Sequence, residues 1–319
     1  MSIIRIHLIF LLLSTPLSAQ KIDNTVSYRN IESESYFRFN YDNDYFTATD
    51  ENYTQGYNFE LILKVLEKNP INYLFYKPNS TNSRYGLSLE HIGFTPNDYV
   101  SEDIQFGDRP FASAIMLKSF VVSTNSKKRS RLSQSLSLGI IGPGAFGKEM
   151  QVGIHKATGN KIPGGWDNQI KNDLIVNYRL DYEKQLFAPN TIFEINTKAV
   201  VQLGTLFTNT SVSLNARFGV FNSVLGDAKR NTGFQIYIYS EPVLNLVGYD
   251  ATLQGGLLNT KSPYTISSNN IERLTRQFNY GLIIKTRNLY FEYTRSEITR
   301  EFKTGSLAKW GGIRIGFTF

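Results

Sequence analysis

Cysteine is absent from all 319 residues of the chain, so no disulfide can hold the fold together. Apolar runs are also short. Beyond the N-terminal region none reaches the roughly 20 residues that a membrane-spanning helix needs. The chain lacks a Gly-x-Ser-x-Gly motif and, without cysteine, shows no common nucleophile signature. We therefore expect neither a disulfide-stabilised module nor a helical membrane anchor, and hydrolytic chemistry would have to use an activated water.

The N-terminus predicts export. Residues 1–19 have the layout of a secretory signal peptide, with Arg5 before a short apolar core and mostly small residues up to Ala19. Residues 20–319 would then form the mature protein, which we expect to be one domain. The formal net charge of +7 is spread along the chain and, together with export, argues against nucleic acid as a partner. An anionic membrane surface suits this charge better.

Aromatic residues are abundant, with 22 Phe and 19 Tyr, and both types favour strands. Segments in which apolar and polar residues alternate recur to the end of the chain, and their number is even. Many are longer than strands in soluble sheets and match the length of about 9–11 residues that a tilted membrane strand needs. The predicted strands are 36–43, 55–64, 84–93, 111–122, 131–141, 173–186, 191–204, 209–221, 233–252, 272–286, 288–298 and 309–319.

The alternation separates two chemically different faces. In segment 209–221 one face carries Val212 and Leu214, and the other carries Ser213 and Arg217. A soluble barrel turns its apolar face inward, whereas an outer-membrane barrel turns it toward lipid and keeps polar residues inside. The signal peptide, the strand lengths and the aromatics favour the second arrangement. The predicted fold is all-β: a twelve-stranded antiparallel transmembrane β-barrel with a short helix in an outer loop.

Two places disturb this regular pattern. Glu241-Pro242 interrupts one predicted strand, where proline indicates a bulge or a pause between two strands. The second place is a connection. If the N-terminus is periplasmic, connections after even-numbered strands are periplasmic turns and should be short. Residues 65–83 are a long exception to this rule.

The longest predicted outer connection is 142–172, and a loop of this length is uncommon without a function. Residues 148–158 within it have helical character, bounded by glycines. Met150, Ile154 and Ala157 would form an apolar stripe. We expect this stripe to lie against the barrel wall.

Two features of the outer connections could support chemistry. Asp42, Asn43 and Asp44 begin an acidic connection, where crowded carboxylates repel one another unless a cation lies among them. Their oxygen atoms favour calcium, although the spacing is not that of an EF-hand. His155 is the one plausible imidazole base on an outer loop, whereas His91 falls in a strand and is expected to be a hydrogen-bonded wall residue. A solvated hairpin loop and a structural histidine are the plain alternatives.

Several sequence blocks between residues 38 and 172 stand out together. They are Asn43-Asp44, Asn52-Tyr53-Thr54-x-Gly56, Gly107-Asp108-Arg109-Pro110-Phe111-Ala112, Gly139-Ile140-Ile141-Gly142-Pro143, His155-Lys156 and Gly165-Trp166-Asp167-Asn168-Gln169. In this order they resemble the outer-membrane lipid A deacylases, in particular the lipid A 3′-O-deacylase family. The resemblance implies a twelve-stranded barrel with its site between the wall and a loop helix. It also implies calcium-dependent removal of ester-linked acyl chains from lipid A, a reaction likened to that of secreted phospholipase A2.

The resemblance also implies roles for individual residues. His155 would be the general base, Asn43 and Asp44 would hold calcium, and Thr54 would complete the site from the adjacent strand. The substrate would be lipid A of lipopolysaccharide, reached from the outer-membrane bilayer at the outer rim of the barrel. A characterised-type member of the family carries a functional lysine in the loop before Gly-Asp-Arg, but residues 97–106 contain none.

Two other functions are compatible with the same sequence. A small non-enzymatic outer-membrane channel would use the polar lumen to pass solutes, and a phospholipase A-type barrel would cleave glycerophospholipids instead of lipid A. Within the motif, Asp108 and Arg109 are expected to form a local ion pair that shapes their loop. The sequence does not indicate an oligomeric state or which acyl chain is removed.

Overall fold

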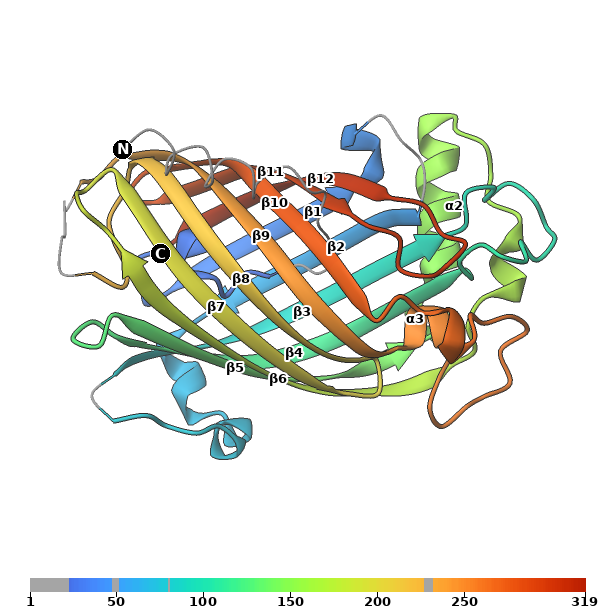
Figure 1. Ribbon diagram of the computed structural model, residues 1–319, viewed down its shortest axis with the longest axis horizontal. Coiled ribbons are helices and arrows are strands. Elements are labelled where there is room, and N and C mark those ends of the chain that lie inside the picture. The colour runs from blue at the N-terminus through green and yellow to red at the C-terminus, as the bar shows by residue number, and fades with distance from the viewer. Residues whose placement is uncertain (1–22, 48–51, 80, 227–231) are drawn as a thin grey trace, which may run out of the picture.

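The structure, a computed structural model, describes residues 23–47, 52–79, 81–226 and 232–319. The predicted signal peptide lies outside these ranges. The described strands form one closed antiparallel barrel, in which each strand pairs with its sequence neighbours and β1 pairs with β12 (Figure 1). The prediction of a twelve-stranded antiparallel barrel is confirmed.

All the strands lie where the sequence pattern places them, with ends that differ by a few residues. Their lengths run from 8 to 16 residues, which suits strands that cross a bilayer at a tilt. The strands are β1 (Tyr36–Asn43), β2 (Asn52–Ile62), β3 (Asn82–Thr95), β4 (Ala112–Asn125), β5 (Ser130–Ile141), β6 (Asp173–Phe187), β7 (Phe193–Gly204), β8 (Phe207–Val220), β9 (Gln235–Asp250), β10 (Leu274–Lys285), β11 (Leu289–Ile298) and β12 (Ala308–Thr318).

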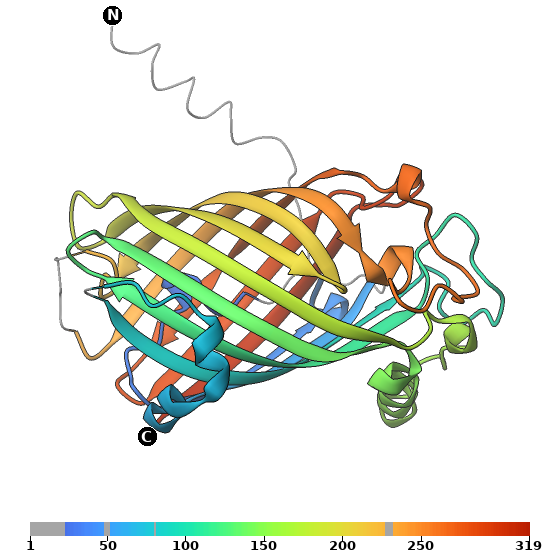
Figure 2. The same cartoon turned by 90° about the horizontal axis from the view of Figure 1, so that it is seen from below.

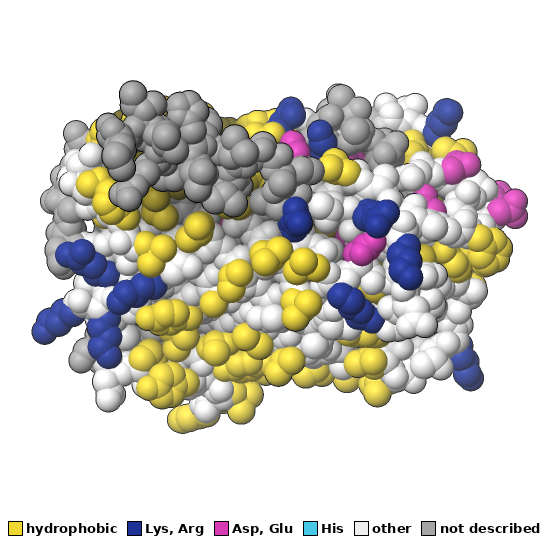
Figure 3. All heavy atoms as spheres, viewed as in Figure 1, with side chains coloured by type: hydrophobic (Ala, Val, Ile, Leu, Met, Phe, Trp, Pro, Cys, Tyr) yellow, Lys and Arg dark blue, Asp and Glu magenta, His cyan; other side chains and the backbone are white. Residues whose placement is uncertain are grey.

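Side chains alternate between lipid and lumen as predicted. On β8, Val212 and Leu214 are 54% and 48% exposed on the outer surface, whereas Ser213 and Asn215 are buried on the lumen side. Figure 3 shows apolar side chains spread over the barrel wall, with several Lys and Arg side chains at its left end. The outer surface is thus apolar and the interior polar, as in barrels that span an outer membrane.

The proline in β9 does not divide the strand. The ladder with β8 lapses between the pairs Ser213–Val243 and Ala216–Ser240, with two residues skipped on each strand. Because the two skipped segments are equal, the register is unchanged and there is no bulge. The expected pause is a local gap in pairing at Pro242, which has no N–H to donate, and the strand count stays even.

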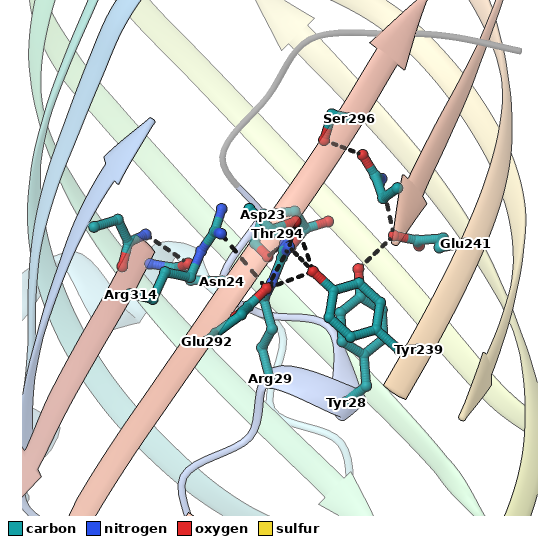
Figure 4. Close-up of polar contacts among 12 residues, drawn as sticks. Asp23, Asn24, Tyr28, Arg29, Tyr239, Glu241, Glu292, Thr294, Ser296 and Arg314 are labelled. Atoms are coloured by element: carbon teal, nitrogen blue, oxygen red, sulfur yellow. Dashed lines mark hydrogen bonds and ion pairs between the residues drawn. The ribbon is translucent and has the colours of Figure 1, made fainter. Parts of the chain in front are cut away.

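The lumen contains a segment that sequence analysis did not predict to lie there. Residues 23–31, here called the lumen plug, fold into the barrel and include the short 3-10 helix η1 (Ser27–Arg29). The Arg29 guanidinium donates to the Glu292 carboxylate of β11 at 2.8 Å (Figure 4). The Tyr28 hydroxyl donates to Glu241 of β9, also at 2.8 Å. Polar wall residues are therefore matched by polar groups of the chain's own N-terminal part.

Other contacts join the lumen plug to further strands. Asp23 forms ion pairs with Arg179 of β6 at 2.6 Å and with Lys198 of β7 at 2.8 Å. Arg38 of β1 donates to the carbonyl oxygen of Arg29 at 2.7 Å. Removing one partner of such a buried pair costs about 3–5 kcal/mol, since the other charge is left uncompensated. A lumen occupied in this way weighs against an open solute channel.

The two ends of the barrel carry different connections. The long-loop end holds the helices of the connections after odd-numbered strands, and the short-turn end has tight connections such as 126–129 and 286–288 (Figure 1). The helices at the long-loop end are η2 (Asp44–Thr47), η5 (Pro143–Ala145), α2 (Gly147–Thr158), η6 (Gly165–Asn168), α3 (Ala251–Gln254) and η7 (Ser268–Asn270). The long exception at the short-turn end is confirmed, and it holds η3 (Lys64–Lys68) and η4 (Pro70–Leu74). Among the described residues no helix is long and apolar enough to span a membrane.

Candidate active site

The predicted helix in the longest connection is present as α2, but it presents a different face to the barrel. Its buried residues are Gly147, Gln151 and His155, spaced four apart on one side. Met150 and Ile154 are only partly buried and Ala157 is exposed. The expectation that the apolar stripe lies against the wall is therefore wrong. In a lipid surrounding, the apolar side of a helix can face outward, which leaves a polar side for the wall.

The wall beneath this connection is polar on its outward face. His91 of β3 has its Nε2 atom 3.0 Å from the carbonyl oxygen of Ala145, which confirms the expected hydrogen-bonded wall histidine. The backbone oxygen of Ser113 of β4 accepts a hydrogen bond from the backbone N–H of Gly142 at 2.8 Å. A Cβ atom on Gly147 would lie 2.5 Å from the Cβ atom of Ser113. Glycine thus lets the start of α2 approach the wall closely.

Trp166 of η6 fixes the buried side of α2. Its indole Nε1–H donates to Oε1 of Gln151 at 2.6 Å, and its ring packs against Phe111 at 5.0 Å between centroids. Nε2 of Gln151, Oε1 of Gln169 and Nδ1 of His91 are buried and have no hydrogen-bond partner among the described residues. Leaving a buried polar atom unpaired costs about 1–3 kcal/mol, so such atoms are expected where a ligand or water supplies the partner.

The imidazole of His155 is held by two contacts. Its Nδ1 atom lies 2.6 Å from the carbonyl oxygen of Lys161, which can only accept, so Nδ1 carries the proton of the neutral ring. Nε2 is then the acceptor. The edge-to-face contact with Tyr99, at 5.5 Å between ring centroids, also orients the imidazole. Sequence analysis identified this histidine but not the two residues that hold it.

Asn43 and Asp44 lie at the same end of the barrel, where β1 passes into η2. The Asn43 amide donates to the Tyr41 hydroxyl at 3.0 Å on the outward face, and Asp44 is buried, with 2% of its surface exposed. The Tyr41 ring stacks on Tyr57 of β2 at 5.1 Å. Tyr57 in turn lies 6.2 Å from the ring of His91, which contacts the loop that leads into α2. A row of aromatic rings therefore connects Asn43 to the loop that precedes α2.

The meeting of these groups around one reaction centre stays a prediction. These contacts place Asn43 and α2, which carries His155, at one end of the barrel (Figure 1). The side chain of Thr54 lies outside the described part of the chain. Asp42 does not belong to this corner, because it faces the lumen and pairs with Arg314 at 3.4 Å.

A cation at this corner would need mixed oxygen ligands. Within the described residues no group of three or more His, Cys, Asp or Glu side chains is arranged to hold a metal ion. Asn43 offers an amide oxygen and Asp44 offers a carboxylate. Calcium is a hard cation that prefers oxygen ligands of these kinds. The remaining positions would belong to backbone carbonyls, water or substrate.

Two further motif residues have structural partners. The prediction of a local Asp108–Arg109 ion pair is wrong: the Arg109 guanidinium pairs with Glu301 at 3.1 Å and lies over the Phe94 ring at 4.1 Å. The Asp108 carboxylate instead accepts from the backbone N–H groups of Arg109 and Asn97. Burial raises the pKa of Glu301 to about 7, and the nearby Arg109 opposes this shift. The pair joins two loops that are far apart in sequence.

Asp167 has a plain structural role. Its carboxylate accepts from Nζ of Lys148 at 2.6 Å, and both side chains are largely exposed. An exposed pair of this kind contributes only about 0–1 kcal/mol. Asp167 therefore ties η6 to α2 at an exposed position.

Comparison with known proteins gives a family match and a fold match. The model of the family described as outer membrane protein LpxR matches residues 6–319. Among solved structures, LpxR from Salmonella typhimurium has a TM-score of 0.73 at 18% identity, covering 89% of this chain and 100% of the other. The beta domain of the Bordetella autotransporter BrkA has a TM-score of 0.44 at 9% identity, covering 89% and 98%. A search of curated proteins found no match.

Proposed function

Since this chain belongs to the LpxR family of outer membrane proteins, we propose that it is a lipid A deacylase. It would hydrolyse an ester-linked acyl chain of the lipid A part of lipopolysaccharide. One observation supports this proposal: α2 buries a polar side that carries His155, and Gly147 at its start packs against Ser113 on the outward face of the wall. Polar side chains on the outside of a membrane barrel lie within reach of a lipid and have no use in solute passage.

The position of α2 suits an outer-leaflet substrate. Outer-membrane barrels have short periplasmic turns and longer outer loops, which assigns the long-loop end to the cell surface. The connection between β5 and β6 then lies at the outer rim. Acyl esters of lipid A lie near the interface between hydrocarbon and headgroups, at the depth where the rim loops meet the bilayer.

The chemistry assigned to His155 is general base catalysis. Nε2 takes a proton from a water molecule as the water oxygen bonds to the ester carbonyl carbon. The tetrahedral intermediate then breaks its bond to the alcohol oxygen, and the imidazolium returns the proton to that oxygen. The products are a free fatty acid and lipid A with one free hydroxyl. The Lys161 carbonyl stabilises the imidazolium, since it accepts from Nδ1–H throughout.

The donor set of Asn43 and Asp44 fits calcium, and these residues would hold it beside the base. When bound, the ion would polarise the ester carbonyl and stabilise its developing negative charge. We assign Thr54 to the same corner from the start of β2. The resemblance to lipid A 3′-O-deacylases supports these assignments.

Mass spectrometry of lipid A tests the proposal in cells that express the wild type, His155→Ala or Lys156→Ala. Lys156 is the next residue on α2 and is exposed, so it is a matched control. We expect lipid A to lose one acyl chain with the wild type and with Lys156→Ala, and to stay intact with His155→Ala. Heat-dependent migration on gels would verify that each barrel is folded.

Two results would count against the proposal. Continued deacylation by His155→Ala would remove this histidine from the reaction. Intact lipid A together with released lysophospholipid from folded wild type would identify a phospholipase instead.

A further inference from the structure

One connection at the short-turn end does not behave as a turn. Residues 63–79 carry η3 and η4 and lie along the outside of the barrel wall, beside β4 and β5 (Figures 1 and 2). We call residues 64–77 the foot. It lies on the same lipid-facing surface as α2, but toward the opposite end of the barrel.

A polar exception in the wall fixes the foot. Gln134 points outward on β5, on the face that otherwise carries Leu132 and Leu136. Its Oε1 atom accepts from the backbone N–H of Tyr76 at 2.8 Å, and its Nε2 atom donates to the carbonyl oxygen of Tyr76 at 2.7 Å. The Tyr178 hydroxyl donates to the same Oε1 atom at 3.0 Å. A glutamine on a lipid-facing strand is thus explained by the segment that it holds.

The outer surface of the foot has the composition of a membrane-interface element. Its apolar side chains are strongly exposed, while lysines lie among them. The exposed apolar residues are Val65 (63%), Tyr73 (87%), Leu74 (63%) and Tyr76 (68%), and the exposed lysines are Lys64, Lys68 and Lys77. Aromatic side chains with lysines are typical of segments that lie at the boundary of headgroups and acyl chains.

A groove of about 700 Å³ runs between the foot and the wall. Tyr76 and Pro78 line one side of it, and Leu180 and Tyr182 line the other. Lys128, from the β4–β5 turn, lies at its polar end. Among the described residues that line the groove, none is acidic. An apolar trough with a cation at one end matches the shape and charge of a phospholipid.

We propose that this groove binds an anionic glycerophospholipid of the periplasmic leaflet. Its acyl chains would lie along Leu180 and Tyr182, and its phosphate would face Lys128. Lys77, between the lining residues Tyr76 and Pro78, would add positive charge beside the groove. Lysines near a membrane surface favour anionic over zwitterionic headgroups. The site is independent of the deacylase proposal, because it lies at the other end of the barrel and uses none of the same residues.

Native mass spectrometry of the purified full-length protein tests the site. The probes are phosphatidylglycerol and phosphatidylcholine, added separately to protein in detergent. We expect retained phosphatidylglycerol on the wild type at concentrations where phosphatidylcholine is lost. Each lysine near a phosphate contributes about fivefold in affinity, so the double variant Lys77→Gln/Lys128→Gln should lower the preference by about 25-fold.

Matched variants keep the test specific. Lys261→Gln/Lys303→Gln removes the same charge from exposed loops at the long-loop end and should leave binding unchanged. Gln134→Leu removes the clamp on Tyr76 and should also abolish the preference, while the barrel keeps its folded gel migration. The proposal is overturned if both lipids bind equally to wild type. It is also overturned if the control pair lowers binding as much as Lys77→Gln/Lys128→Gln.

Discussion

Two connections cover polar places on the outer wall of this barrel, and they do so in opposite ways. Under the foot, both side-chain atoms of Gln134 are engaged by the backbone of Tyr76. Under α2, Gln151 and His91 each keep a buried side-chain atom with no partner among the described residues. The first arrangement is a closed clamp, and the second leaves hydrogen-bonding capacity for something else.

The difference separates attachment from function on one surface. A polar residue on a lipid-facing strand is costly unless its groups are paired, so each exception needs an explanation. Gln134 is explained by the segment that it fixes. On the side of α2 that carries Gln151 and His155, Nε2 of Gln151 is left for a substrate headgroup, an ion or water, and the catalytic proposal is placed there.

The largest expected effect on activity comes from Asp44, at the end of β1, and it contrasts with the effect of Asp42 on the lumen side of the same strand. Asp44→Asn keeps the size of the side chain and removes its charge, so activity on lipid A should fall by a factor of about 100 or more and no longer respond to calcium. The measurement is acyl release in detergent with calcium and with excess chelator. Wild type should lose activity in chelator.

Asp42→Asn is the matched control on the lumen side. It leaves Arg314 with a weaker partner, so it should lower thermal stability and keep the calcium response. Full wild-type activity in excess chelator would remove the metal from the account.

A smaller effect is expected from the support of α2. Trp166→Phe keeps an aromatic ring beside Phe111 and removes the N–H that holds Gln151. The loss of one hydrogen bond, about 1 kcal/mol, should reduce the turnover number about fivefold. Steady-state kinetics would measure it, with Trp310→Phe, a buried tryptophan on the β12 side, as the control. Equal losses in both variants would indicate general loosening instead of a specific support.

The smallest effect on activity should come from the foot. Gln134→Leu continues the leucine pattern of the outward face and releases Tyr76, so deacylation should stay within about twofold of wild type. Trypsin should then cut faster at Lys64 or Lys68, as followed by peptide mapping. A loss of activity as large as that of Trp166→Phe would show that the two covered places are coupled.

Most of the fold could be predicted from the sequence because strand alternation is a local signal with a period of two. The sequence of each strand shows which of its faces is apolar and which is polar, as Val212 and Ser213 illustrate. The lumen plug could not be predicted in this way. Its partners, such as Glu292 for Arg29 and Glu241 for Tyr28, lie more than 200 residues away in the sequence. They come close to it only when the barrel closes.

The sequence predicts which residues belong to the candidate site better than it predicts how they are arranged. His155 and the polar neighbours at the end of β1 follow from the sequence blocks. The side of α2 that packs against protein does not follow from them. Helical periodicity places Met150 and Ile154 on one apolar stripe but does not show whether this stripe contacts protein or lipid. Likewise, adjacency suggested Asp108 as the partner of Arg109, whereas folding brings Glu301 to it.

An experimental structure of the protein with calcium and a lipid A analogue would test the central claim most directly. We predict an ion bound to side-chain oxygens of Asn43 and Asp44 at about 2.3–2.6 Å, with Nε2 of His155 within reach of a water that faces the ester carbonyl. An imidazole directed away from that corner, or an ester bound elsewhere on the barrel, would contradict the account.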